Sequence, residues 1–200
     1  MDINFVSFFY LFFRLAPFIL VCFFSLASIF NQDLKGIIYL IGVIVACFVT
    51  LMMGNALPST MSVPNEICST ITMGGTPAFS KLPLGQCILG YTFAYLMFGI
   101  INNNYVLNNL PTIIFFPVVI IADMVWNLKN SCYSITRLIG SLIIGGGVGF
   151  SWGLILHKSK LGNLQYFTKV SGKEECSRPA KSTFKCNVYK NGKLLSQNIG

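Results

Sequence analysis

Apolar residues in this chain come in long runs, and five of these runs are long enough to cross a lipid bilayer. Backbone N–H and C=O groups in lipid must find their hydrogen-bond partners within the segment, so each run is predicted to be an α-helix. Residues 1–157 are therefore predicted to form an all-α helical bundle of about five membrane spans. The spans lie near residues 5–30, 37–54, 85–101, 110–128 and 138–156.

The first run is predicted to be a retained span, because residues 1–13 carry no basic side chain and no small-x-small cleavage site follows. A re-entrant first segment would change both the number of spans and the side on which each loop lies. Most connections are short, but the loop 55–84 is long and rich in proline and glycine. A connection of that length is predicted to be functional or to pack as a lid.

Residues 158–200 follow a different pattern. Apolar and polar residues alternate from Phe184 to Tyr189, and Asn191-Gly192 then precedes a second β-favouring run. Asn-Gly at that place favours a type I′ turn, so a β-hairpin is predicted around residues 184–195 of a small soluble tail. An isolated hairpin is marginally stable in water. It would need a third strand, such as 164–170, a partner, or a disulfide, which Cys176 and Cys186 could form.

Charge is concentrated in this tail. Only 10% of residues are charged, against about 25% in an ordinary soluble domain. Nine of the 14 Lys and Arg residues lie between Lys158 and Lys193, where only Glu174 and Glu175 oppose them. The excess of basic residues on the tail side of the spans favours a cytoplasmic tail and a non-cytoplasmic N-terminus.

Arg14 and Asp123 are the ionisable residues well inside the spans. At 1.5 Å per residue, Arg14 lies about 14 Å and Asp123 about 6 Å below the same membrane surface. An extended arginine could therefore meet the aspartate, and an intramembrane ion pair is predicted. Two snorkelling side chains are the simpler alternative, and a proton relay is disfavoured because no further protonatable groups lie at that depth.

Small residues recur every four positions in the fifth run, which places Ser141, Gly145, Gly149 and Gly153 on one helix face. Such a face lets another helix backbone approach closely. Packing within the chain is the favoured interpretation, and a contact between copies of the chain is the alternative. Local unwinding at 145–147, as in a transporter's broken helix, is the third.

The remaining chemistry is sparse. Cys22, Cys47 and Cys87 lie in apolar runs, where cysteine acts as a small hydrophobe, and no disulfide framework is predicted. An enzyme acting on lipid or thiols would need Cys68, Cys87, Cys132 or His157 as nucleophile or base. The seven Asp, Glu and His residues do not cluster, and no CxxC or HxxxH spacing occurs. No catalytic residue, cofactor or metal site is predicted.

The basic tail has three interpretations: binding to anionic lipid headgroups, to nucleic acid, or to a protein partner. A purely electrostatic segment would not need a hairpin pattern. A module that docks onto a protein is therefore favoured, with lipid contact in addition, and nucleic acid is disfavoured. The predicted docking residues are Arg178, Lys181, Lys185, Lys190 and Lys193.

Several stretches carry a resemblance: LPLGQCILGYTFAYL, LPTIIFFPVVIIADMVWN, the glycine face, and ECSRPAKSTFKCNVYKNGKLL in the tail. Together they are similar to multi-span membrane proteins of large eukaryotic double-stranded DNA viruses of the algal-virus and mimivirus-like kind. The resemblance implies a structural protein of the virion's internal membrane, or of the host endomembrane from which it is made, that links the bilayer to the capsid. A small ion channel or transporter is the alternative, followed by a membrane enzyme.

Overall fold

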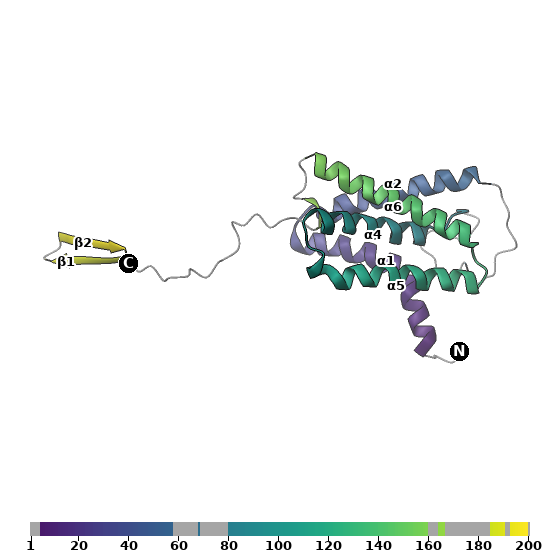
Figure 1. Cartoon of the computed structure of the whole chain (residues 1–200), viewed down its shortest axis with the longest axis horizontal. Coiled ribbons are helices and arrows are strands. Elements are labelled where there is room, and N and C mark those ends of the chain that lie inside the picture. The colour runs from purple at the N-terminus through teal and green to yellow at the C-terminus, as the bar shows by residue number, and fades with distance from the viewer. Residues whose placement is uncertain are drawn as a thin grey trace. The chain divides into compact units, whose positions relative to one another are not determined.

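The computed structural model describes residues 5–57, 68, 80–159, 164–166, 185–190 and 193–199, and the chain divides into two compact units, Met1–Thr168 and Lys169–Gly200. The first unit is a bundle of α-helices (Figure 1). In the described residues, five helices are long and apolar enough to cross a membrane, which confirms the predicted helical spans. The elements are α1 (Phe5–Asn31), α2 (Lys35–Ala56), α4 (Leu84–Asn102), the 3₁₀ helix η1 (Leu107–Asn109), α5 (Leu110–Lys129) and α6 (Ile135–Lys158).

The outer surface of the bundle is apolar. Phe23, Ile29, Phe30 and Ile143 are each more than 60% exposed. A soluble domain rarely shows large apolar side chains so densely on its surface, whereas lipid solvates them without cost. The surface is that of a multi-pass integral membrane protein.

Helix α4 is the centre of the bundle. In α4, 67% of an 18-residue apolar segment is buried inside the bundle, against 22–33% for the corresponding segments of the other four spans. Three tyrosines fill the space around it: the rings of Tyr91 and Tyr95 are stacked, and Tyr39 on α2 packs against both. The Tyr39 hydroxyl and Thr92 Oγ1 lie 2.7 Å apart, so a polar group in this core has its partner inside the bundle.

The bundle has two ends. The disulfide end comprises, among the described residues, Leu57, Cys68, residues 80–83 and the connection 130–134, and Cys68 is bonded there to Cys132. The tail end comprises the connections 32–34 and 103–109, with Ser159 and residues 164–166. Gln165 donates to the Gly153 carbonyl at 2.7 Å, and the Tyr166 hydroxyl donates to the Phe24 carbonyl at 2.7 Å.

These two hydrogen bonds change the predicted boundary. The helical unit ends at Thr168, rather than at residue 157, because residues 164–166 pack against the helices. The suggestion that a third tail strand begins at 164 is wrong for the same reason: residues 164–166 form a short 3₁₀ turn and bends.

The second unit contains two antiparallel strands, β1 (Lys185–Lys190) and β2 (Lys193–Ile199). Lys190 pairs with Lys193, and an irregularity in the register falls between Val188 and Tyr189. The predicted turn at Asn191-Gly192 lies outside the described residues, and so does Cys176, the predicted disulfide partner of Cys186. That this unit is a soluble docking module stays a prediction.

Candidate functional site

Arg14 and Asp123, the ionisable residues predicted to meet inside the membrane, are in contact. Arg14 Nη1 lies 3.3 Å from Asp123 Oδ1 and 3.2 Å from Asn127 Oδ1. The Arg14 guanidinium carbon also lies 4.3 Å from the centre of the Trp126 ring, a cation–π distance. One cation on α1 is therefore held by three side chains of α5, those of Asp123, Trp126 and Asn127.

The carboxylate of Asp123 has further partners. Its Oδ2 accepts hydrogen bonds from Gln86 Nε2 at 2.7 Å and from Asn127 Nδ2 at 3.0 Å. Gln86 and Asn127 are fully buried, and Asp123 is 3% exposed. Because Gln86 lies on α4, the cluster joins three helices around one charge pair whose carboxylate is buried.

This arrangement is suited to structure more than to proton transfer. A buried charge is tolerated when its oxygens are paired and hydrogen-bonded, and both oxygens of Asp123 are. Tyr133 lies in the loop beside the cluster. Burial raises the pKa of its phenol, while the nearby positive charges of Arg14 and Arg137 act in the opposite direction.

The glycine face of α6 packs on α4. A Cβ added at Gly145 or Gly149 would collide with the carbonyl oxygen of Cys87 or Tyr91, respectively. Ser141 Oγ donates to the Pro83 carbonyl at 2.7 Å, and a Cβ at Gly153 would stand 2.8 Å from the Phe98 ring. The predicted face is thus occupied within the chain.

The structure does not support the two alternative interpretations of that face, local unwinding and a contact between copies of the chain. Helix α6 is continuous from Ile135 to Lys158, so the unwinding considered at 145–147 is absent from this described segment. The four small residues are buried, so they offer no surface to a second copy. By contrast, Gly140 and Gly147 have no atom within 4 Å of an added Cβ, and they lie off this face.

Cys68 and Cys132 form a disulfide across 64 positions of sequence. No disulfide framework is predicted from the sequence, and this one bond departs from that prediction, because Cys68 in the long loop comes back to the α5–α6 connection. The bond also removes both thiols from the set of potential nucleophiles. The free thiol of Cys87 is buried and accepts a hydrogen bond from Thr50 Oγ1 at 3.0 Å.

The other predicted residues are placed more simply. His157 Nδ1 lies 3.1 Å from Asn102 Nδ2 at the tail end, a contact between two helix ends. Arg178, Lys181 and Cys176 lie outside the described residues. The structure gives the backbone of Lys185, Lys190, Lys193 and Cys186 in the strands, so their docking role and the Cys176–Cys186 bond stay predictions.

Sequence reasoning missed three members of the polar cluster: Gln86, Trp126 and Asn127. A signal for two of them was present. Asn127 follows Asp123 by four residues and so shares its helix face, and Trp126 follows it by three. Gln86 is a long polar side chain in an otherwise apolar span, and such residues face the bundle interior.

No family model, no curated protein and no solved structure matches this chain.

Proposed function

We propose that this protein is a structural membrane component that fixes a basic C-terminal module at one face of a bilayer. The observation that carries the proposal is the division of the chain into a helical unit ending at Thr168 and a separate unit, Lys169–Gly200. The helical unit has an apolar surface and polar groups that bond to one another. The tail holds most of the positive charge of the chain.

The packing of the bundle supports an anchoring role. Helices α4 and α6 approach one another to backbone contact. The tyrosine core around α4 fills the interior of the bundle with side chains. The Asp123 cluster and the Tyr39–Thr92 pair satisfy polar groups internally. An anchor needs rigidity of this kind and needs no path for a solute.

We further propose that the tail faces the cytoplasm. Basic residues favour that side for the tail end. The Cys68–Cys132 bond provides an independent reason, because disulfides persist in oxidising, non-cytoplasmic compartments and this one lies at the opposite end. A membrane-impermeant maleimide tests this in a Cys68→Ser variant. Cys132 should label in intact cells. Cys186, which the cytoplasm would keep reduced, should label only after permeabilisation; the reverse order would overturn the orientation.

The partner we propose is a repeated soluble protein, and the viral resemblance suggests the coat of a virion built around an internal membrane. Cross-linking mass spectrometry in native membranes or particles tests this directly. Lysine-reactive reagents should link Lys181, Lys185, Lys190 or Lys193 to such a protein. Links restricted to copies of this chain would contradict the docking role and indicate a self-contained oligomer.

A matched pair of charge variants sharpens that experiment. Lys185→Glu with Lys193→Glu reverses charge on the strands, whereas Lys35→Glu with Lys158→Glu reverses it on the helical unit at the tail end. Docking through the tail predicts that the first pair weakens co-purification of the partner and the second does not. Equal losses would point to general electrostatic attraction instead.

A small channel or transporter is the second candidate. The observation in its favour is the intramembrane cluster, in which Gln86 Oε1 is buried and has no hydrogen-bond partner among the described residues. Ion flux measured after reconstitution into liposomes, and lost in Asp123→Asn, would favour this function over the anchor. Absence of flux in the wild-type protein would remove it.

A further inference from the structure

A cavity of about 700 Å³ lies at the tail end of the bundle, between the C-terminal half of α1 and the first turns of α5. Leu96 of α4 and Tyr166, which follows α6, also line it. Pockets that hold ligands of the size of a drug molecule have volumes of about 300–1,000 Å³. The cavity is therefore large enough for one compact molecule.

The cavity opens toward the lipid. Of the side chains that line it, Phe23 and Phe115 are 61% and 43% exposed, whereas Leu96 and Phe116 are each 3% exposed. The first two thus lie at the mouth of the cavity, and the second two lie at its inner wall. A molecule dissolved in the bilayer can reach the cavity without leaving the membrane.

Polar side chains line the end of the cavity at the membrane surface. Asn31 is the last residue of α1, and Thr112 lies in the first turn of α5. Leu20, which also lines the cavity, precedes Asn31 by eleven residues, or about 16 Å along the helix. That length is about half the thickness of a bilayer's hydrocarbon core. The lining is thus polar at the surface and apolar over the depth of one leaflet.

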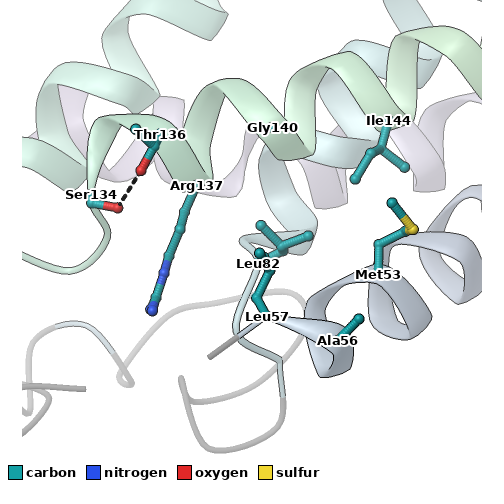
Figure 2. Close-up of a pocket in the computed structure, with 9 residues that line it drawn as sticks. All are labelled: Met53, Ala56, Leu57, Leu82, Ser134, Thr136, Arg137, Gly140 and Ile144. Carbon is teal, nitrogen blue, oxygen red and sulfur yellow. Dashed lines mark hydrogen bonds between the residues drawn. The ribbon is translucent and has the colours of Figure 1, made fainter. Parts of the chain in front are cut away.

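The polar end suits a neutral group. None of the described residues that line this cavity is charged. A second cavity, of about 470 Å³ at the disulfide end, differs: Figure 2 shows Arg137 in its lining, beside Ser134 and Thr136 where α6 begins. The amide of Asn31 and the hydroxyl of Thr112 can each donate and accept a hydrogen bond. They match a neutral hydroxyl and provide no countercharge for a phosphate or a carboxylate.

Aromatic rings form the walls of the cavity. One of them, Tyr166, is held by its hydroxyl, which donates to the Phe24 carbonyl at 2.7 Å, and its ring centre lies 4.5 Å from that of Phe24. A rigid, flat ring system packs on such faces with little loss of conformational freedom, whereas an acyl chain loses freedom at each bond that it fixes. The rings that line the cavity are Phe23, Phe24, Phe115, Phe116 and Tyr166.

The sequence around Tyr166 fits the same class of ligand. Residues 164–169 read LQYFTK. The order Leu-x-Tyr-x-x-Lys falls within a pattern proposed for sterol contact, in which a tyrosine stands between Leu or Val and Lys or Arg. That pattern is short, and its weight here comes from Tyr166, which independently lines the cavity. Lys169 lies outside the described residues and is not part of the site.

From the neutral polar end, the aromatic walls and the depth of one leaflet, we propose that this cavity binds one sterol molecule from the leaflet at the tail end. The sterol hydroxyl lies beside Asn31 and Thr112, and the sterol rings lie between the phenylalanines of α1 and those of α5. The site belongs to the helical unit alone, so it goes beyond the anchoring role and does not depend on what the basic tail binds.

Three changes test separate parts of the site, each with a matched control. Ala27 lines the cavity, so Ala27→Phe should fill it; Gly147→Phe is its control, because a side chain added at Gly147 meets open space. Thr112→Val removes the hydroxyl at the polar end, with Thr136→Val at the disulfide end as its control. Phe23→Leu keeps an apolar side chain and removes the ring. Its control is Phe18→Leu, since Phe18 is also on α1, is 48% exposed and does not line the cavity.

The full chain is reconstituted into phosphatidylcholine liposomes with a photoreactive cholesterol analogue, irradiated, and mapped by peptide mass spectrometry. The wild type should be labelled on α1 and α5 near the lining residues, and excess cholesterol should suppress the labelling. Ala27→Phe should abolish it. Thr112→Val should weaken binding by about two- to tenfold, the effect of one hydrogen bond. Phe23→Leu should weaken it by a similar factor, the effect of one aromatic contact. The three controls should behave as wild type.

Labelling that Ala27→Phe leaves unchanged overturns the proposal, since the cavity would then not be the site. So does labelling of the same residues by a photoreactive phosphatidylcholine that excess cholesterol does not reduce, because an acyl chain would then be the occupant. Equal losses in Thr112→Val and Thr136→Val would overturn the role of the polar end. If Ala27→Phe lowers thermal stability, the comparison of Phe23→Leu with Phe18→Leu decides, and equal labelling of those two variants overturns the site.

Discussion

Arg14 on α1 and Asp123 on α5 are 109 positions apart in the sequence, yet Arg14 Nη1 lies 3.3 Å from Asp123 Oδ1. Removing one member leaves the other as an unpaired charge inside the membrane, which costs about 3–5 kcal/mol in buried sites of soluble proteins. Asp123→Leu and Arg14→Met should therefore each lower the thermal unfolding temperature in detergent.

The double variant Arg14→Met with Asp123→Leu distinguishes the cost of an unpaired charge from simple loss of packing. Because both charges are gone, it should be more stable than either single variant. A double variant as unstable as the sum of the two single changes would show that the pair does not couple α1 to α5.

Gly149 is predicted to be intolerant of any side chain. A Cβ there would collide with the Tyr91 carbonyl oxygen, which belongs to a helix backbone and cannot rotate away. Gly149→Leu should destabilise the bundle by about 1–3 kcal/mol or more, the usual range for overpacking. Gly147→Leu, where the added atoms meet open space, should leave the melting temperature unchanged. Equal melting curves for both variants would refute the close α4–α6 contact.

The sequence was enough to predict the spans and the contact between Arg14 and Asp123. Lipid imposes helices on long apolar runs, and the helical rise fixes the depth of each residue along them. The four-residue spacing of Gly145 and Gly149 likewise identified a packing face. The partner of that face was not predictable, because in a membrane the residues that face lipid and those that face a helix are both apolar.

The disulfide and the cavity were missed for a different reason. Cys68 and Cys132 are 64 residues apart, and their meeting depends on the path of a loop that no hydrophobic period describes. The cavity at the disulfide end, about 470 Å³ between the last turn of α2 and the first turns of α6, likewise depends on the approach of two elements far apart in the sequence. Spacing along one helix cannot report either relationship.

The Cys68–Cys132 bond makes a direct chemical prediction. The wild type is unfolded without reductant and treated with maleimide. Peptide mapping should then find Cys132 unlabelled, whereas Cys132 should be labelled in Cys68→Ser. Loss of the bond should lower stability by about 2–4 kcal/mol, since it closes a long loop. Cys47→Ser is the control, because Cys47 is a free cysteine and its loss should leave Cys132 protected. Labelling of Cys132 in the unreduced wild type would contradict the bond.

Tyr166 should make the tail end sensitive to alkaline pH. Burial, with the negative charge of Asp33 adding to it, raises the pKa of its phenol to about 12. An unfolded tyrosine ionises near a pKa of about 10. The hydroxyl's contribution, a hydrogen bond to the Phe24 carbonyl worth about 0.5–1.5 kcal/mol, is therefore fully present below pH 10 and lost as the pH rises to 12. In thermal melts, Tyr166→Phe should be less stable than the wild type at pH 8, and the two curves should converge between pH 10 and 12. A stability difference that stays constant over that range would show that the hydroxyl is not protected by the bundle.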